Sequence, residues 1–207
     1  MRQLLKKLTP AAWQKAAAES AAEPPRGGFK VFIVELLKSA FFAFVTIYLV
    51  RYFLFKPFYV RGASMEPNFF EKEYLIIDEI SYRLREIQRG DIIVFRYPQH
   101  AKEFFLKRII ALPSEEVKIK NGQIIIFNQI HPHGFTLKEA YLPDGLQTRG
   151  DKEFILAADE YFVLGDNRTN SWDSRSFGLV KRDLIIGRVW LRGWPLGRLT
   201  KFDGVKY

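Results

Sequence analysis

The chain has 207 residues, which is enough for one folded domain with appendages or for two small domains. Hydrophobic residues make up 48% of it and aromatic residues 15%, a composition that can bury a sizeable core and excludes a disordered chain. The formal net charge of +9 suits an anionic membrane surface or a nucleic acid. Cysteine is absent, so a disulfide framework and a cysteine-based metal site are both excluded.

An apolar segment dominates the N-terminal quarter of the chain. Residues 39–55 read SAFFAFVTIYLVRYFLF, with Arg51 as their only charge, and residues 31–38 are apolar apart from one glutamate and one lysine. A helix over 31–55 would be about 37 Å long, which exceeds the ~30 Å hydrocarbon core of a bilayer. We therefore expect a single transmembrane anchor over residues 31–56. The alternative is a buried core helix, since charges interrupt the apolar run.

The flanking charges indicate an orientation for this anchor. Residues 1–30 carry six lysines and arginines against two glutamates, and the positive-inside rule places such a segment in the cytoplasm. Residues 57–207 would then lie across the membrane. The N-terminal stretch MRQLLKKLTPAAW lacks the apolar run of a cleavable signal peptide, so we expect none.

After Pro57 the helical pattern gives way to short apolar runs separated by turn signals. Asn121-Gly122, between EVKIK and QIIIF, is a strong hairpin signal. Many short strands without intervening helical patterns predict a mostly β, antiparallel domain. The expected strands cover residues 74–78, 91–97, 103–112, 116–120, 123–128, 160–165 and 185–191.

Ser64 lies between small residues in GASMEP and is a candidate nucleophile. A serine nucleophile needs a base, most often a histidine. The three histidines, His100, His131 and His133, all lie in polar loop sequences without an adjacent carboxylate. A Ser/His hydrolase remains possible on this pattern, although ordinary solvated loop histidines explain it more simply.

Lys107 is a second candidate base. If residues 103–112 form a strand, Lys107 shares one face with Phe105 and Ile109, so its side chain is placed among apolar neighbours. Burial lowers the pKa of a lysine, and a neutral amine can deprotonate a serine hydroxyl. On the strand pattern alone, a lysine whose stem packs while its head reaches water is favoured.

The stretch GDNRTNSWDSRSFG (165–178) concentrates carboxylates, carboxamides, hydroxyls and arginines after an expected strand. Asp173 and Arg175 in it are candidates for a charge-assisted pair. The alternative is an ordinary polar turn, but the density of hydrogen-bonding groups favours a loop that supports a site.

Taken together, these stretches resemble the bacterial type I signal peptidases. The resemblance runs from about residue 38 onward through five segments in the order of that family. The segments are the anchor running into RYFLFKPFYV, then GASMEP, RGDIIVF, FLKRIIALPSE and GDNRTNSWDSRSFG. The family fold implies a mostly antiparallel β catalytic domain with a smaller β excursion, for which residues 113–155 are the candidate.

The resemblance implies a role for each matching residue. Ser64 corresponds to the nucleophile, with its backbone N–H as an oxyanion donor, and Lys107 corresponds to the general base. Ser171 matches the serine that orients the lysine, and Asp173 and Arg175 match a supporting ion pair. The residues that would form the floor of the site are Met65, Asp166, Asn167 and Arg168.

Two departures from the family pattern bear on the site. Gly62 stands where some members have a serine that supplies a second oxyanion donor. The lysine motif of the family usually ends in Gly-Leu-Pro-Gly-Asp, whereas here it ends in Ala111-Leu112-Pro113-Ser114-Glu115. The loss of both glycines leaves the conformation of this turn open.

The resemblance implies a membrane-bound serine endopeptidase that cleaves signal peptides from secretory preproteins after A-x-A type sites, without a metal or another cofactor. Its location would be the bacterial cytoplasmic membrane, with the bilayer and the preproteins as partners. An inactive, anchored peptide-binding homologue is the alternative. A nucleic-acid partner is not expected, because the basic residues are scattered and no recognition motif accompanies them.

Overall fold

The structure is a computed structural model that describes residues 28–53 and 55–202, and the side chains of residues 49–56 are not described. The expected cytoplasmic segment 1–30 therefore lies almost wholly outside the described residues, as does the side chain of Arg51. The chain divides into two compact units, residues 1–48 and residues 49–207. Each is described here by itself, and the second is called the globular unit.

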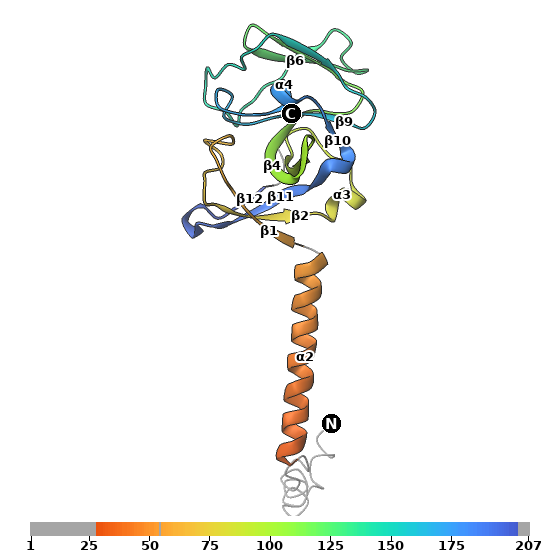
Figure 1. The fold of residues 1–207 in the computed structure, drawn as a ribbon, viewed down its shortest axis with the longest axis vertical. Helices are drawn as coiled ribbons and strands as arrows, with labels where there is room; N and C mark the ends of the chain where they lie inside the picture. Colours follow the sequence, from red (N-terminus) through yellow and green to blue (C-terminus); the bar gives the residue numbers. More distant parts are fainter. Residues whose placement is uncertain (1–27, 54, 203–207) are drawn as a thin grey trace, which may run out of the picture. The chain divides into compact units, whose positions relative to one another are not determined.

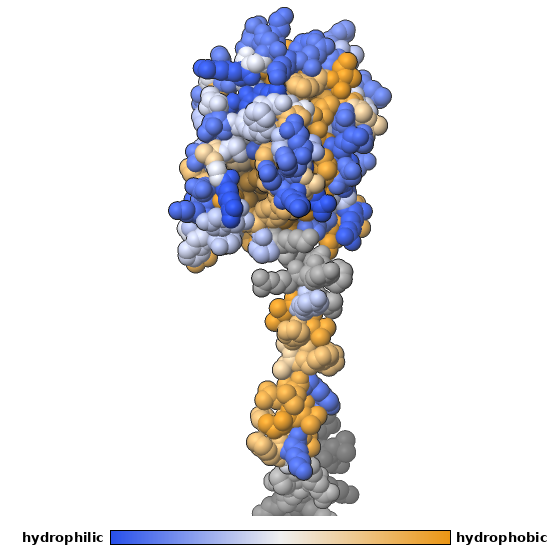
Figure 2. All heavy atoms as spheres, viewed as in Figure 1, coloured by the Kyte–Doolittle hydropathy of each residue, from blue (hydrophilic) through white to orange (hydrophobic). Residues whose placement is uncertain are grey.

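The first unit contains most of one long helix, α2 (Phe29–Phe53), which begins and ends two residues before the expected range of 31–55. Its stretch Phe29–Tyr48 has a mean hydropathy of 1.9, long and apolar enough to cross a membrane. Most of its described apolar side chains are exposed, and Figure 2 shows them in orange on the face turned to the viewer, so the helix is not a buried core helix of its own unit. Two of its charged residues, Lys38 and Glu35, pair with each other at 3.3 Å.

The globular unit is built on an eight-stranded, wholly antiparallel sheet with the strand order β1-β2-β11-β3-β4-β9-β10, and β12 pairs with β11 (Figure 1). This confirms the predicted fold class. The strands are β1 (Phe55–Tyr59), β2 (Tyr74–Asp78), β3 (Ile92–Tyr97), β4 (His100–Ala111), β9 (Glu160–Leu164), β10 (Val180–Lys181), β11 (Ile185–Trp194) and β12 (Thr200–Lys201).

A second antiparallel sheet of four strands has the order β7-β6-β5-β8. Its strands are β5 (Glu116–Lys120), β6 (Gln123–Phe127), β7 (Phe135–Thr136) and β8 (Lys152–Ile155). Asn121 and Gly122 join β5 to β6 with φ values of 52° and 78°, the left-handed pair that a tight two-residue hairpin requires. The predicted hairpin is therefore confirmed.

Short helices complete the globular unit. They are α3 (Ser81–Leu84), α4 (Ser174–Phe177) and the 3-10 turns η1 (Arg182–Leu184) and η2 (Leu196–Arg198). The aspartate before α4, Asp173, caps it by accepting a hydrogen bond from the Arg175 backbone N–H at 3.3 Å.

Strand β3 and the C-terminal end of β4 are buried on both faces, which explains the apolar runs IIVF and IIA in their sequences. Ile93, Phe95 and Ile109 point into one core, whereas Ile92 and Val94 point into another. A third core joins the C-terminal half of β4 and β9 to the four-stranded sheet. The N-terminal half of β4 is different: within the described residues, no strand pairs with its outer edge before Arg108.

Candidate active site

Ser64 lies in the loop between β1 and β2 and is half-buried. The loop is fixed to a distant part of the chain, because the backbone N–H of Asn167 donates to the Ser64 carbonyl at 3.0 Å. The Asn167 side chain donates to the Ala63 carbonyl, also at 3.0 Å. These two bonds hold the backbone on either side of the serine hydroxyl, although more than 100 residues separate the partners in sequence.

Lys107 extends from β4 toward this serine, and its Nζ lies 2.7 Å from Ser64 Oγ. The lysine is only 4% exposed and makes one further hydrogen bond, to the Leu106 carbonyl at 3.1 Å. Burial lowers its pKa from 10.5 to about 8, and the negative charges of Asp173 and Asp166 oppose this shift. With such a pKa, roughly one molecule in ten carries the neutral amine at pH 7. The strand pattern alone favoured a solvated ammonium, and that expectation was wrong.

Ser171 lies against Gly165, on the side where the Ser64 carbonyl also approaches this glycine. A Cβ added at Gly165 would lie 2.6 Å from Ser171 Cβ and would overlap the Ser64 carbonyl oxygen, so only glycine fits between the two serine segments. Ser171 Oγ is buried and has no hydrogen-bond partner among the described residues, Lys107 included. The orienting bond implied by the family resemblance is thus not formed in this structure, and that role stays a prediction.

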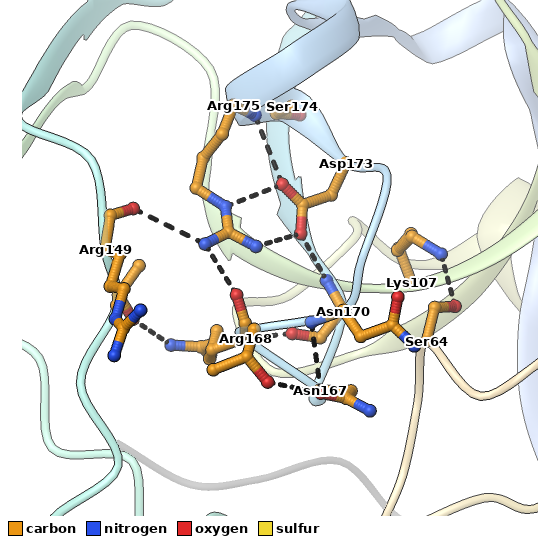
Figure 3. A network of polar contacts seen from close by, with 12 residues as sticks. Ser64, Lys107, Arg149, Asn167, Arg168, Asn170, Asp173, Ser174 and Arg175 are labelled. Carbon is orange, nitrogen blue, oxygen red and sulfur yellow. Dashed lines mark hydrogen bonds and ion pairs between the residues drawn. The ribbon is translucent and has the colours of Figure 1, made fainter.

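Asp173 and Arg175 form the paired charges expected from the sequence. Two parallel hydrogen bonds of 2.8 Å join the guanidinium to the carboxylate (Figure 3). Asp173 also accepts from the Gly165 N–H at 3.1 Å, and Arg175 donates to the Arg168 carbonyl at 2.9 Å. The pair therefore holds both ends of the loop that carries Ser171.

A second buried ion pair supports the site from the other side of β4. Arg108, the residue after Lys107, binds Asp166 through two hydrogen bonds of 2.8 and 2.6 Å, and both side chains are almost fully buried. Asn68 donates to the same carboxylate at 2.9 Å. Arg168 in turn donates to Glu139 at 2.6 Å. Sequence reasoning identified Asp166 and Arg168 but missed these partners.

Met65 is 2% exposed and packs in the core cluster that contains Val60, Phe69 and Leu75. It lies directly after Ser64 in the chain, so its anchored side chain fixes the position of the serine backbone. This packing is compatible with the floor role that the resemblance implies, which stays a prediction.

A cavity of about 840 Å³ opens beside Ser64 and Lys107. Two stretches of chain form its walls, residues 57–64 and the N-terminal half of β4. Its apolar lining includes Phe58, Val60, Met65, Val94 and Leu106. None of the three histidines, all of which lie in the described part of the chain and are exposed, contributes to this lining. The geometry therefore favours lysine over histidine as the partner of Ser64.

The turn that lacks the two family glycines is nevertheless well formed. Ser114 adopts the left-handed conformation itself, with φ of 62°. Glu115 accepts hydrogen bonds from the Leu112 N–H at 2.8 Å and from Arg89 at 2.6 and 2.8 Å. A carboxylate at position 115 thus fixes the turn without glycine.

Comparisons with known proteins indicate the family of this chain. The family model described as "Signal peptidase, peptidase S26" matches residues 33–194. A probable signal peptidase I-2 from Synechocystis sp. is 38% identical over 80% of this chain and 75% of its own length. A signal peptidase I from Leptolyngbya laminosa is 36% identical over 90% of this chain and 88% of its own.

Among solved structures, a signal peptidase I from Enterococcus faecalis V583 is 30% identical and aligns with a TM-score of 0.43, covering 51% of this chain and 97% of that one. The assignment rests on the family model and on the sequence relatives, which span most of the chain. The chain belongs to the signal peptidase I family of serine endopeptidases.

Proposed function

We propose that this protein removes N-terminal signal peptides from secretory preproteins with a Ser64/Lys107 dyad. The observation that carries the proposal is the 2.7 Å contact between Lys107 Nζ and Ser64 Oγ, made by a lysine whose burial lowers its pKa to about 8. A serine hydroxyl is a weak nucleophile until a neighbouring base accepts its proton. A neutral lysine amine at hydrogen-bonding distance meets that requirement.

In the first half of the reaction, Ser64 Oγ attacks the scissile carbonyl carbon while its proton passes to the neutral amine of Lys107. The resulting ammonium then protonates the leaving amine nitrogen as the peptide C–N bond breaks, which releases the mature protein. The signal peptide remains esterified to Ser64. In the second half, Lys107 takes a proton from water, the hydroxide oxygen attacks the ester, and the proton returns to Ser64 Oγ as the signal peptide leaves.

Negative charge develops on the carbonyl oxygen during both attacks. The Ser64 backbone N–H is the donor that we assign to this oxyanion, and each such donor typically contributes about 3–4 kcal/mol to transition-state stabilisation. Gly62, with φ of 80°, offers no side chain to act as a second donor. The second donor in this chain is then a backbone group or a water molecule.

The unpaired edge of β4 supports binding of the substrate as an added strand. Residues 102–107, which do not pair with β9, line one side of the cavity, and the segment 57–64 lines its other side. An extended peptide in this groove can form main-chain hydrogen bonds with the sheet. Val60, Met65, Val94 and Leu106 surround the space beside the serine, and these walls suit the small P1 and P3 residues of an A-x-A site.

Helix α2 is the proposed membrane anchor. Its 25 residues span about 37 Å, and its exposed apolar side chains need a nonpolar environment. We place residues 1–30 in the cytoplasm and the anchor, residues 31–56, in the bacterial cytoplasmic membrane. Residues 57–207, which include the smaller β excursion 113–155, would lie on the outer side of that membrane. This topology brings the catalytic unit to the membrane face where signal peptides emerge.

A cleavage assay tests the proposal. The detergent-solubilised protein should cut a preprotein with an A-x-A site, and Ser64→Ala and Lys107→Ala should each lower kcat/KM by at least about 1,000-fold. Lys107→Arg should be equally inactive, because an arginine cannot give up its proton near neutral pH. As the matched control, the triple variant His100→Ala, His131→Ala, His133→Ala should retain activity.

Near-full activity in Lys107→Ala would rule out the dyad, and loss of activity in the histidine variant would support a Ser/His hydrolase. An inactive peptide-binding homologue predicts a third pattern, in which the wild-type protein binds the preprotein but never cleaves it.

A further inference from the structure

Trp172 is a large, exposed aromatic residue at the active site that the proposed mechanism does not use. It lies between Ser171 and Asp173 in sequence, is 56% exposed and lines the same cavity as Ser64 and Lys107. A tryptophan held half in solvent at the edge of a peptide groove leaves a large apolar surface uncovered. That surface would be covered by a bound peptide.

The indole is held in a fixed position. Its Nε1–H donates to the Tyr97 hydroxyl at 3.1 Å. The Tyr97 ring stacks on the Phe105 ring, with centroids 4.7 Å apart and planes inclined by 15°. Phe177 packs edge-on against both rings, at 5.5 Å from Tyr97 and 6.2 Å from Phe105. A side chain that is already anchored loses little entropy when a ligand packs against it.

Side-chain alternation along β4 places this tryptophan on a defined face. Phe105 shares the face of Lys107, whereas Leu106 points to the opposite face and packs with Val94 and Met65. Trp172 donates a hydrogen bond to Tyr97, and the Tyr97 ring stacks on Phe105, so Trp172 lies on the same face of the sheet as Phe105. The two faces therefore differ: the Leu106 face carries the apolar side chains of Val94 and Met65, and the Lys107 face carries the aromatic surface formed by Phe105 and the exposed Trp172.

A peptide added as a strand alternates in the same way. If the P1 and P3 side chains enter the pocket lined by Leu106, the P2 side chain between them points to the face with Phe105 and Trp172. We infer that Trp172, together with Phe105, forms a binding surface for the P2 side chain and makes this enzyme prefer a large apolar or aromatic residue at the middle position of the A-x-A site. The inference rests on the proposed function and on strand addition at β4.

The test uses the full chain in detergent and three preproteins that differ only at P2, with Gly, Leu or Phe. The wild-type enzyme should show a kcat/KM roughly 5- to 10-fold higher for Phe than for Gly, the size expected for one aromatic contact. Trp172→Ala should reduce this Phe-to-Gly ratio to less than about 2-fold, and Trp172→Phe should retain part of it.

Trp194→Ala is the matched control, because Trp194 is similarly exposed at 53% but does not line the cavity. It should leave the ratio unchanged. An unchanged ratio in Trp172→Ala, or an equal loss of activity toward all three preproteins, would overturn the inference while leaving the peptidase assignment intact. Failure of the wild-type enzyme to cleave any of the three would instead overturn the proposed function itself.

Discussion

The amino group of Lys107 is buried, and a buried site disfavours its charged form. Its ammonium loses hydration on burial, and the carboxylates of Asp173 and Asp166 compensate only in part, so its pKa falls. The hydroxyl of Ser64 then becomes the group to which the amine can bond. Burial of one strand position thus favours the neutral amine that the proposed base requires.

Gly165 sets how closely the two serines approach. We expect Gly165→Ala to lower kcat/KM by about 100-fold or more, because its Cβ would displace both Ser171 and the Ser64 carbonyl, and small misplacements of reacting groups are costly. Gly197→Ala is the control, since a Cβ there meets nothing within 4 Å. Steady-state cleavage by the two variants measures the difference, and full activity in Gly165→Ala would show that this contact does not position the nucleophile.

For single residues, the sequence identified the side chains of the candidate site but few of the contacts between them. Ser64 and Lys107 followed from motif resemblance, since 43 residues separate them and neither carries a local sign of the other. The bond from Arg168 to Glu139 crosses 29 residues from one loop to another. Such contacts depend on how loops fold back on the sheet, and no local pattern encodes this.

At the scale of single elements, β4 organises the site. Alternation sends Lys107 toward Ser64 and Arg108 to the opposite face, where it pairs with Asp166. The same strand pairs with β9 only from Arg108 onward, so one strand carries the proposed base, a buried arginine of an ion pair and the free edge at which we propose that the substrate binds.

The Arg108–Asp166 pair should contribute strongly to stability. We expect Asp166→Ala to lower the free energy of unfolding by about 3–5 kcal/mol, because it leaves a buried arginine without its counter-charge. Lys118→Ala removes a more exposed pair with Glu153, which solvent screens, and should lower the free energy of unfolding far less. Urea denaturation followed by tryptophan fluorescence compares the two, and similar losses would contradict the assigned role of the buried pair.

The long apolar strands were predictable because their periodicity and length are distinctive, and β2 and β5 were located to the residue. The sequence missed β1, in which Pro57 interrupts the apolar pattern, but an edge strand tolerates a proline. It also missed β8, which is mostly exposed and shows no apolar alternation, and the two-residue strands β7, β10 and β12.

At the scale of the whole molecule, the chain combines an apolar helix with a separate β unit. We expect the protein to remain in the membrane fraction after high-salt and alkaline washing and to be released only by detergent, because the proposed anchor contains a largely apolar helical stretch of 20 residues. Release by salt alone would indicate a peripheral association instead.

The orientation of the chain has a separate test. Protease added to intact spheroplasts should digest the globular unit, whereas inverted membrane vesicles should protect it, since the basic residues of segment 1–30 favour the cytoplasm. The reverse pattern of protection would show that the chain has the opposite topology.

The pH dependence of kcat/KM tests the central claim, activation of Ser64 by neutral Lys107, most directly. The folded-state pKa of Lys107 lies below its ordinary value, so the active, neutral form should accumulate as the pH rises. We predict that kcat/KM increases nearly tenfold per pH unit below about pH 8 and reaches a plateau above it, with an apparent pKa of about 8. An apparent pKa near 10.5, the value of a solvated lysine, or near 6.5, the value of a histidine, would contradict the account.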